Sequence, residues 1–410
     1  MRILFLTDNF PPEVNAPASR TFEHCKEWVK AGHRVTVITC APNFPVGKVF
    51  AGYQNRLWQV EEMAGIRVIR VWTYITANEG FVKRTLDYGS FMVSAFLASL
   101  FVRGVDVVIG TSPQFFTACA ACLIGGVKGS PFVFELRDIW PESIKAVGAM
   151  KDSVVIRLLE RVEMFLYRRA ACIVAVTESF KRILVGRGVD GGKIEVVTNG
   201  VDLAGFGPRE KDPELMNRFG LEGKFVAGYV GTHGMAHALE TILKAADRIR
   251  MREDGDTYRF IFLGNGARKQ ALMSLAAQMG LTNVVFIDTV PKAAVARYWS
   301  LLDVSIIHLR KTGLFTTVIP SKLFECMGMG IPVLLGVAGE SAEIVEKEGV
   351  GLTFEPENAE ELCAKLETLR RDEDLRRRFR ENCLAAARRY DRSVLAARIL
   401  NILEGLVRRQ

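Results

Sequence analysis

A lysine and a glutamate one helical turn apart are the residues of this sequence best placed to do chemistry. Pro320 and Ser321 are good helix starters, and two glycines close the helix they open after about two turns. Lys322 then falls in the first turn, where the partial positive charge of the helix repels an ammonium group unless an anion binds. Helix amides and an ammonium together make a phosphate site, and Glu325 follows where a carboxylate can accept both hydroxyls of a ribose. The pattern predicts a nucleotide site that uses Ser321, Lys322 and Glu325, and the alternative is a solvated Lys-Glu pair.

A glycine turn supports the nucleotide interpretation. Gly231, Thr232 and Gly234 follow the candidate strand Phe225–Val230 and open a helix. Glycine lets the backbone of such a turn come close to a ligand. We therefore expect all three residues to contact the nucleotide.

A second glycine turn follows the candidate strand Phe260–Leu263 and contains Gly264, Asn265 and Arg268. It could be mistaken for a dinucleotide-binding fingerprint, but Lys269 stands where the third glycine belongs, so a nicotinamide cofactor is disfavoured. Arg268 suits a diphosphate, and an exposed position at a helix start is its alternative role.

One charged cluster in the first half follows a candidate strand. Glu135–Ser143 runs from that strand into a loop that Trp140 and Pro141 would hold rigid. Loops at strand ends carry function, so Asp138 is predicted to be a site residue rather than a structural ion-pair partner.

The sequence offers no convincing metal site. His233 and His237 form an HxxxH without a glutamate after the first histidine and without an evident third ligand. Two acidic triplets, Asp254–Asp256 and Asp372–Asp374, match a DxD pattern but are placed in a surface turn and at a helix start. We expect no metal and no other cofactor.

Composition and charge narrow the class of protein. The 410 residues exceed what one hydrophobic core usually covers, which predicts two domains. The net charge of +8 favours anionic partners, but the basic residues are dispersed, so nucleic acid is not an expected partner. The eight cysteines have no disulfide spacing, and Cys119 and Cys122 are expected to be small buried hydrophobes. These features favour a cytoplasmic protein.

Short β-branched runs alternate with amphipathic stretches, which predicts an α/β fold with parallel sheets. Candidate strands in the first half are Arg2–Thr7, Arg34–Thr39, Ile66–Val71, Val105–Gly110, Pro131–Leu136, Cys172–Val176 and Ile194–Val197. Those in the second half are Phe225–Val230, Phe260–Leu263, Val284–Ile287, Val304–His308, Ile331–Leu335 and Gly351–Phe354.

The two alternations predict two Rossmann-like domains. A stretch rich in Gly and Pro, Asp202–Gly223, is the expected linker between them. We place the first domain at residues 1–204 together with a final helix, 391–410, that packs back on it, and the second at 205–390. Ligands are expected at the carboxyl ends of the strands, in a cleft between the domains.

The most apolar stretch covers residues 88–102, and about 20 such residues would be needed to span a bilayer. It is either a buried crossover helix or a helix lying in the membrane interface. Lys151–Arg169, which mixes arginines with large apolar residues, is a second candidate. We predict weak peripheral contact with anionic membrane.

Taken together, these segments resemble the family 4 glycosyltransferases, which are retaining enzymes with the GT-B fold. The subgroup most similar transfers N-acetylfucosamine and related amino sugars in O-antigen and capsule synthesis. The matching segments are Phe10–Glu13, Ala16–Arg20, Asp138–Ser143, Thr198–Asp202, Gly264–Gly266 and Ile319–Glu325.

The resemblance implies an acceptor-binding first domain, a donor-binding second domain and a terminal crossover helix. It implies that Lys322 and the Gly231–Gly234 turn hold the leaving diphosphate, that Glu325 holds the ribose, and that Asp138 faces the acceptor. The base would stack near Val290. The donor would be a UDP-sugar, and the acceptor would be lipid-linked or a polysaccharide at the inner face of the cytoplasmic membrane, with no essential metal.

Two departures from the family pattern accompany the resemblance. Thr317 stands where the first glutamate of an E-x7-E pattern belongs. Met235, Ala236 and His237 follow Gly234, where the family often carries an Arg and a Lys, and His237 or Arg268 is the expected substitute. Two alternative functions stay open. One is a UDP-sugar 2-epimerase, which shares the architecture, and the other is a non-catalytic, membrane-bound partner of a polysaccharide complex, which would fit Thr317 and the apolar helices.

Overall fold

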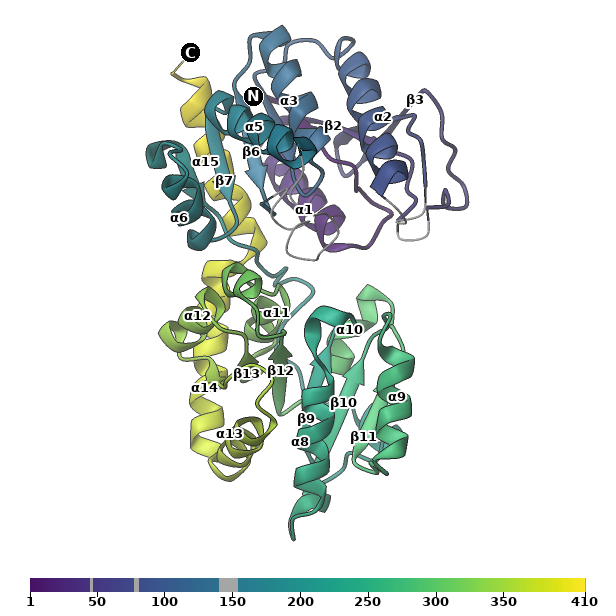
Figure 1. Ribbon diagram of the computed structural model, residues 1–410, viewed down its shortest axis with the longest axis vertical. Helices are drawn as coiled ribbons and strands as arrows, with labels where there is room; N and C mark the ends of the chain where they lie inside the picture. Colours follow the sequence, from purple (N-terminus) through teal and green to yellow (C-terminus); the bar gives the residue numbers. More distant parts are fainter. Residues whose placement is uncertain (45–46, 77–80, 140–153, 410) are drawn as a thin grey trace. The chain divides into compact units, whose positions relative to one another are not determined.

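The computed structural model describes residues 1–409 except 45–46, 77–80 and 140–153 (Figure 1). By its contacts the chain divides into unit 1, residues Met1–Thr198 with Arg392–Gln410, and unit 2, residues Asn199–Asp391. The first boundary lies a few residues before the expected position, because Val201 packs into the core of unit 2. Val201 also forms a β-bridge with Asp391, at the second boundary.

Unit 1 is built on an eight-stranded sheet in the order β3-β4-β2-β1-β5-β6-β7-β8. All neighbouring strands are parallel except the edge pair β3 and β4. The strands are β1 (Arg2–Leu6), β2 (Arg34–Cys40), β3 (Trp58–Met63), β4 (Ile66–Val71), β5 (Val107–Thr111), β6 (Phe132–Leu136), β7 (Cys172–Ala175) and β8 (Ile194–Val196).

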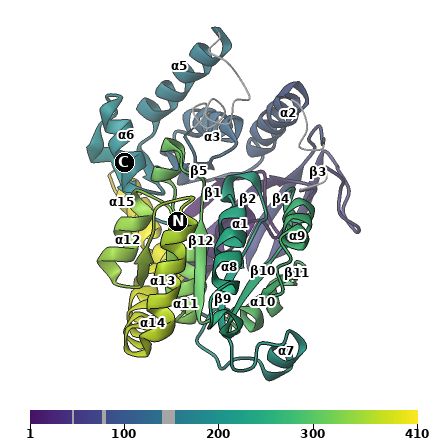
Figure 2. The same ribbon diagram turned by 60° about the horizontal axis from the view of Figure 1, so that its bottom comes forward.

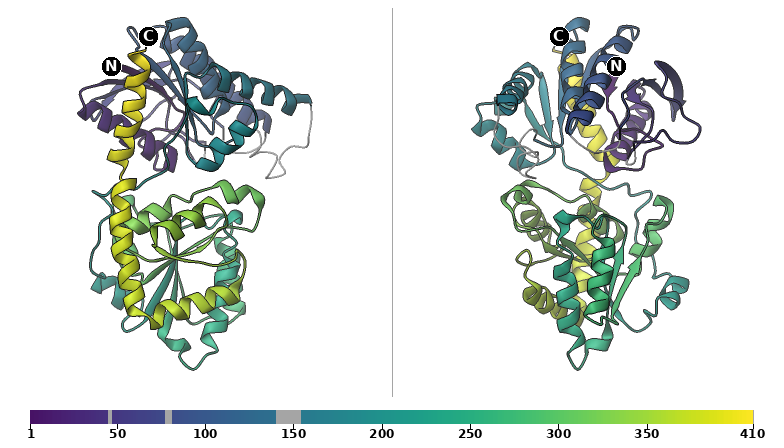
Figure 3. Two further views of the ribbon diagram at one scale, coloured as in Figure 1. Left: turned by 90° about the vertical axis from the view of Figure 1, so that its left-hand side faces the viewer. Right: turned by 45° about the vertical axis from the view of Figure 1, so that its right-hand side comes forward.

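Helices cover both faces of this sheet (Figure 1). Helices α1 (Ala16–Lys30) and α15 (Arg392–Val407) share one core, where Trp28 Nε1 donates a hydrogen bond of 2.9 Å to Ala396 O. The terminal helix therefore packs on unit 1, as predicted (Figure 3). The opposite face carries α2 (Phe81–Ser99), α3 (Phe115–Lys128), α5 (Val154–Arg169) and α6 (Glu178–Gly186).

Unit 2 has a six-stranded parallel sheet in the order β11-β10-β9-β12-β13-β14, the strand order of a Rossmann fold. The strands are β9 (Phe225–Val230), β10 (Tyr258–Leu263), β11 (Val284–Ile287), β12 (Val304–His308), β13 (Val333–Gly336) and β14 (Gly351–Thr353). The prediction of two Rossmann-like domains is confirmed.

Helices also cover both faces of the second sheet. Helix α8 packs against α13, and α11 packs against α14 (Figure 2). The helices are α7 (Pro213–Arg218), α8 (Glu240–Arg250), α9 (Lys269–Gln278), α10 (Lys292–Trp299), α11 (Lys322–Met329), α12 (Glu340–Glu348), α13 (Ala359–Arg371) and α14 (Glu373–Ala387).

Two local elements were not predicted from the sequence. The expected linker contains helix α7, because Asp212 caps it by accepting from Leu215 N and Pro213 suits its first position. Strand β3 was not predicted. It alternates polar and apolar residues at the edge of the sheet, and Ala64 and Gly65, both with positive φ, turn it back onto β4.

Each sheet has one topological switch point, a pair of neighbouring strands whose following connections lead to opposite sides along the sheet. In unit 1 this point lies between β1 and β5, and in unit 2 between β9 and β12. Ligands of open parallel sheets bind beyond the carboxyl ends of the strands at such points. Each unit therefore has one topologically favoured position for a ligand.

The most apolar stretch of the sequence, residues 88–102, lies in α2 and continues into the turn after it. Within the part of the chain that the structure describes, no helix combines the length and the apolar character needed to cross a membrane. Helix α2 nevertheless leaves Leu86, Val93 and Leu97 more than half exposed.

Candidate functional site

The two glycine turns of unit 2 are held against each other at the carboxyl ends of β9 and β10. His233 N donates to Asn265 O at 2.9 Å. A Cβ added to Gly264 would lie 2.0 Å from the carbonyl oxygen of Gly231, and one on Gly266 would lie 2.5 Å from that of His233. Only glycine allows these approaches, so the two turns form one tightly packed backbone surface.

Lys322, the first residue of α11, reaches this surface from the other side of the switch point. Its Nζ is buried and has no hydrogen-bond partner among the described residues. The Nζ lies 3.8 Å from the centroid of the Tyr229 ring and 2.7 Å from where a Cβ on Gly231 would stand. The structure thus brings together Lys322 and the Gly231 turn, residues that are far apart in the sequence.

Burial lowers the pKa of Lys322 to about 8, and the carboxylate of Glu325 opposes that shift. A buried ammonium donor without an acceptor is destabilising by roughly 1–3 kcal/mol or more. An anion seated between Lys322 and the Gly231 turn would satisfy it. This is the arrangement expected of a phosphate-binding lysine.

Two histidines surround the same tyrosine. The ring centroids of His233 and His237 lie 5.9 and 5.7 Å from that of Tyr229, whose hydroxyl donates to Thr232 O at 2.8 Å. Both ring nitrogens of His233 and the Nδ1 of His237 are buried and lack a partner among the described residues. Burial lowers the pKa of each histidine to about 4, so both rings are neutral near pH 7. A neutral imidazole offers one N–H donor and one acceptor.

His308, the last residue of β12, fixes the position of the His237 turn. Glu357 N donates to its Nε2 at 2.8 Å, so the proton lies on Nδ1, which donates to His237 O at 2.7 Å. The ring also stacks on Phe354, with centroids 5.8 Å apart. Sequence reasoning missed this residue, although a histidine at the end of a predicted strand was an available signal.

The basic residues of the second glycine turn have partners in the protein. Arg268 pairs with Glu240 at 2.5 Å. Lys269 donates to Gly264 O at 2.9 Å and pairs with Asp288 at 2.5 Å. The role of Arg268 at a diphosphate stays a prediction.

The remaining predicted residues of unit 2 lie around this centre. Ser321 precedes α11 with helical backbone and no side-chain cap bond. Gly234 precedes the 3-10 turn Met235–His237. Glu325 is half-buried, and half-buried Val290 packs against the core, where stacking of a base stays a prediction.

Thr317 ends a short 3-10 helix, and its hydroxyl donates to Leu314 O at 3.0 Å. Its side chain is therefore engaged within its own turn. It offers a hydroxyl at the position where the family pattern has a carboxylate.

The switch point of unit 1 carries a cavity of about 270 Å³ that the sequence did not predict. Asp8, Glu13 and Asp87 line it with Gln114, whose Nε2 donates to the Asp8 carboxylate. Burial raises the pKa of Asp8, and burial with the nearby Asp8 charge raises the pKa of Asp87 to about 7. The carboxyl oxygens Asp8 Oδ1 and Glu13 Oε2 are buried without a partner among the described residues.

Asp138 follows β6 and lies beside this switch point without lining the cavity. Its backbone N–H and that of Arg137 both donate to Ser112 Oγ, at 3.1 and 2.7 Å. The Asp138 side chain is half-buried. The predicted rigid segment Trp140–Ser143 lies outside the described residues, and the facing of Asp138 toward an acceptor stays a prediction.

A buried ion cluster stabilises the end of β6. Arg20 lies 3.3 Å and Arg137 3.9 Å from Glu135. Although burial alone would raise it, the pKa of Glu135 falls to about 2 because Arg20 and Arg137 stabilise the carboxylate.

Among the described residues, no group of three His, Cys, Asp or Glu side chains could hold a metal ion.

Comparison with known proteins identifies the family. The family described as "Glycosyl transferase 4-like domain" matches residues 15–200, and "Glycosyl transferases group 1" matches residues 211–384. The two matches fall on the two Rossmann-like units and together span most of the chain. The chain belongs to the glycosyltransferases built from these two domains.

Particular relatives support the assignment. The chain is 28% identical over 378 residues, 89% of its own length and 91% of the relative's, to the protein of Escherichia coli strain K12 assigned to colanic acid biosynthesis as the glycosyl transferase WcaI. It is 25% identical over 371 residues to a GDP-mannose-dependent alpha-mannosyltransferase of Mycolicibacterium smegmatis, covering 89% of this chain and 86% of that one. The solved structure of Anabaena Alr3699/HepE with UDP-glucose shares the fold, with a TM-score of 0.72, 17% identity and coverage of 99% and 100%.

Proposed function

We propose that this protein moves an N-acetylamino sugar from a UDP-sugar to a lipid-linked or polysaccharide acceptor in cell-surface glycan synthesis, with retention of anomeric configuration. The supporting observation is the buried Nζ of Lys322, which lies against the Gly231 turn and has no hydrogen-bond partner among the residues that the structure describes. The E. coli relative is assigned to synthesis of a surface polysaccharide, and Alr3699/HepE was solved with UDP-glucose.

In the proposed reaction, unit 2 stabilises the diphosphate that leaves the sugar. A protonated Lys322 and the amides of the Gly231 and α11 starts would oppose the charge that develops on the leaving oxygen. In a retaining reaction, one oxygen of that diphosphate takes the proton of the acceptor hydroxyl. The site needs no metal for this step, so activity should survive chelation of divalent cations.

His237 is the better candidate for the missing cation of the family pattern. The guanidinium of Arg268 is already neutralised by Glu240, whereas the buried Nδ1 of His237 has no partner among the described residues. A bound diphosphate would raise the low pKa of His237 and recruit it as a second donor. We therefore assign His237 to the diphosphate as the replacement for the missing cation, with Arg268 as the alternative.

The carboxylates at the unit 1 switch point suit an acceptor rich in hydroxyl groups. Carboxylate oxygens accept hydrogen bonds from sugar hydroxyls, and the three acidic residues of this lining outnumber its one arginine, Arg84, which disfavours a phosphate placed among them. We place the sugar that accepts the transfer, but not its lipid-linked phosphate, against Asp8 and Asp87. Asp138, after the end of β6 and outside the cavity lining, remains the proposed residue facing the acceptor from that side.

Peripheral membrane contact at the cytoplasmic face is part of the proposal. The outer sides of α2 and α5 expose large apolar residues next to arginines. These residues are Leu86, Val93, Leu97, Val154, Leu158 and Phe165, with Arg157, Arg161, Arg168 and Arg169 on α5. Exposed apolar side chains beside cations suit an interfacial helix surface. Flotation with anionic liposomes should carry the protein upward, and protein that stays at the bottom would refute this part.

The nucleotide assignment is tested by Glu325→Gln. The change should weaken binding of UDP more than binding of inorganic diphosphate, because only UDP carries the ribose that the carboxylate would hold. Equal weakening of both would contradict the ribose role.

Turnover separates transfer from the alternatives. A transferase consumes UDP-N-acetylamino sugar and releases UDP only when a lipid-linked or polysaccharide acceptor is present. Release of an epimer without an acceptor would support the 2-epimerase, and binding without any turnover would support the non-catalytic partner.

A further inference from the structure

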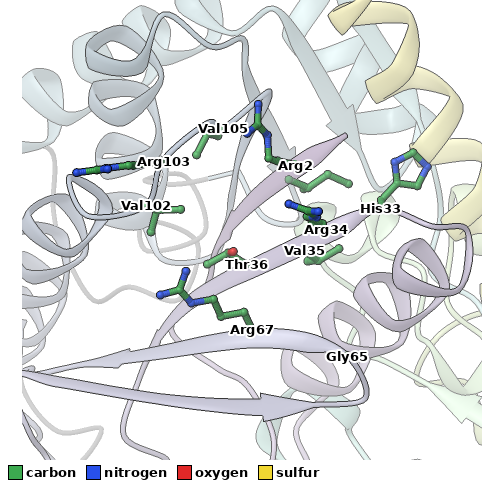
Figure 4. A pocket seen from close by; sticks show the side chains of 11 residues that line it. Arg2, His33, Arg34, Val35, Thr36, Gly65, Arg67, Val102, Arg103 and Val105 are labelled. Carbon is green, nitrogen blue, oxygen red and sulfur yellow. The ribbon is translucent and has the colours of Figure 1, made fainter.

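A second cavity in unit 1, of about 350 Å³, lies at the amino ends of the strands, the sheet edge opposite to Asp8. Four arginines line it, Arg2, Arg34, Arg67 and Arg103, and the lining includes no carboxylate. Figure 4 shows their side chains coming from separate strands and from the loop before β5. The proposed transferase reaction uses none of them.

The cavity exists because helix α2 ends before the edge of the sheet. On β1 the residues Leu4 and Leu6 point into the core under α2, so Arg2 points to the same side. The same alternation puts Arg34 and Thr36 on that side of β2, and Arg67 there on β4. The last turn of α2 closes at Ser99, and these side chains are left uncovered.

Two of the four arginines are neighbours, and three have no carboxylate partner among the described residues. Arg2 and Arg34 are register partners on neighbouring parallel strands, where like charges side by side are unfavourable. Arg2 has a carboxylate partner in Asp106, at 3.5 Å. For Arg34, Arg67 and Arg103, no carboxylate of the described residues lies within 4.0 Å, and Glu62, the register partner of Arg67, does not form an ion pair with it.

The rest of the lining supports a site for an anion. The nearby imidazole of His33 lies 3.1 Å from the Met1 amino group, and its other nitrogen lies 3.5 Å from Glu404, whose second carboxylate oxygen pairs with Arg408. Thr36 adds a hydroxyl, and the buried Val102 forms an apolar wall (Figure 4).

We propose that this cavity binds a phosphate-bearing anion, held by Arg34, Arg67 and Arg103 with Arg2 at its rim. Guanidinium groups bind phosphate oxygens in a bidentate way, and several of them around one cavity match a diphosphate or a phosphomonoester better than a singly charged group. The ligand is either a soluble phosphate compound or the head group of an anionic lipid. The exposed Phe101, packed edge-on against Trp58 two residues before Arg103, offers an apolar surface that a lipid would use.

The first arm of the test uses inorganic diphosphate and calorimetry in a Lys322→Ala background, which removes the proposed nucleotide site. The double variant Arg34→Gln/Arg67→Gln should weaken binding on the order of 100-fold, about tenfold for each guanidinium removed. Arg398→Gln is the matched control, since Arg398 is an exposed arginine of the same unit, outside the cavity. Thermal unfolding checks that the variants remain folded.

The second arm measures co-sedimentation with phosphatidylcholine vesicles, with and without phosphatidic acid. Diphosphate binding that the double variant alone loses identifies a soluble phosphate ligand. Loss of phosphatidic acid binding in the double variant, without diphosphate binding in any variant, identifies a lipid head group. The proposal is overturned if the double variant binds both probes as well as the parent does, or if no variant binds either probe. Neither result bears on the nucleotide site.

Discussion

Replacing Lys322 with methionine should stabilise the protein while abolishing nucleotide binding. The pKa of the buried ammonium is about 8 instead of 10.5, which corresponds to about 3 kcal/mol of folding free energy lost below pH 8. The contact with the Tyr229 ring returns about 1–2 kcal/mol of that cost. Methionine keeps the apolar stem and removes the charge, so the free energy of unfolding should rise by about 1–2 kcal/mol.

The assay is thermal unfolding of both proteins with and without UDP. A gain of about 1–2 kcal/mol corresponds to a midpoint roughly 2–8 °C higher for a domain of this size. UDP should raise the midpoint of the wild type and leave that of Lys322→Met unchanged. Lys244→Met is the control, because Lys244 is an exposed lysine of the same unit and its loss should change stability by at most about 0.5 kcal/mol.

The pH dependence gives the same prediction an independent check. Because the folded pKa is depressed, the unfolded chain binds more protons between pH 8 and 10.5, and wild-type stability rises across that window. The advantage of Lys322→Met should therefore be full below pH 8 and vanish near pH 10.5. A variant less stable than the wild type at pH 7, or one still stabilised by UDP, would refute the reasoning.

Three further outcomes follow. Gly264→Ala should lower the free energy of unfolding by roughly 2–4 kcal/mol and abolish UDP binding, because the new Cβ would stand 2.0 Å from the carbonyl oxygen of Gly231. The control Gly207→Ala, with open space around it, should leave the free energy of unfolding unchanged. UDP affinity measured by calorimetry should fall about tenfold per pH unit above pH 8, as free Lys322 loses its proton, and a flat profile would argue against that group. Asp87→Asn should raise the free energy of unfolding by about 1–2 kcal/mol above pH 7 and leave it unchanged below pH 4. The reason is that the raised pKa of Asp87 makes the wild-type folded state lose stability as the pH rises between those values. Equal effects at both pH values would contradict the burial of that charge beside Asp8.

The sequence predicted the central strands well, because buried parallel strands are continuous β-branched runs with little competition from other structures. Ile66–Val71 and Val284–Ile287 have the predicted bounds. Edge strand β3 escaped because its exposed face carries Trp58 and Val60 while its half-buried face carries Gln59 and Glu61, which is not the usual apolar-in, polar-out alternation. The pattern of apolar residues indicates which strands are buried, and an edge strand is only half-buried.

The site was predictable where its residues stand next to each other in sequence and not where the sheet order brings them together. The start of α11 and the glycine turns carry local signals. The position of Lys322 over Tyr229 depends on β9 lying beside β12, which no local pattern contains. The pairing of Asp8 with Gln114 likewise requires β1 to lie beside β5.

The measurement that tests the central claim most directly is calorimetric binding of UDP, GDP, ADP and NAD to the wild type and to Lys322→Ala. We predict selective binding of UDP that the variant loses while its fold persists. Preference for GDP would keep the site and change the donor. Preference for NAD, no binding of any nucleotide, or UDP affinity unchanged in Lys322→Ala would contradict the assignment of the Lys322 site to a sugar nucleotide.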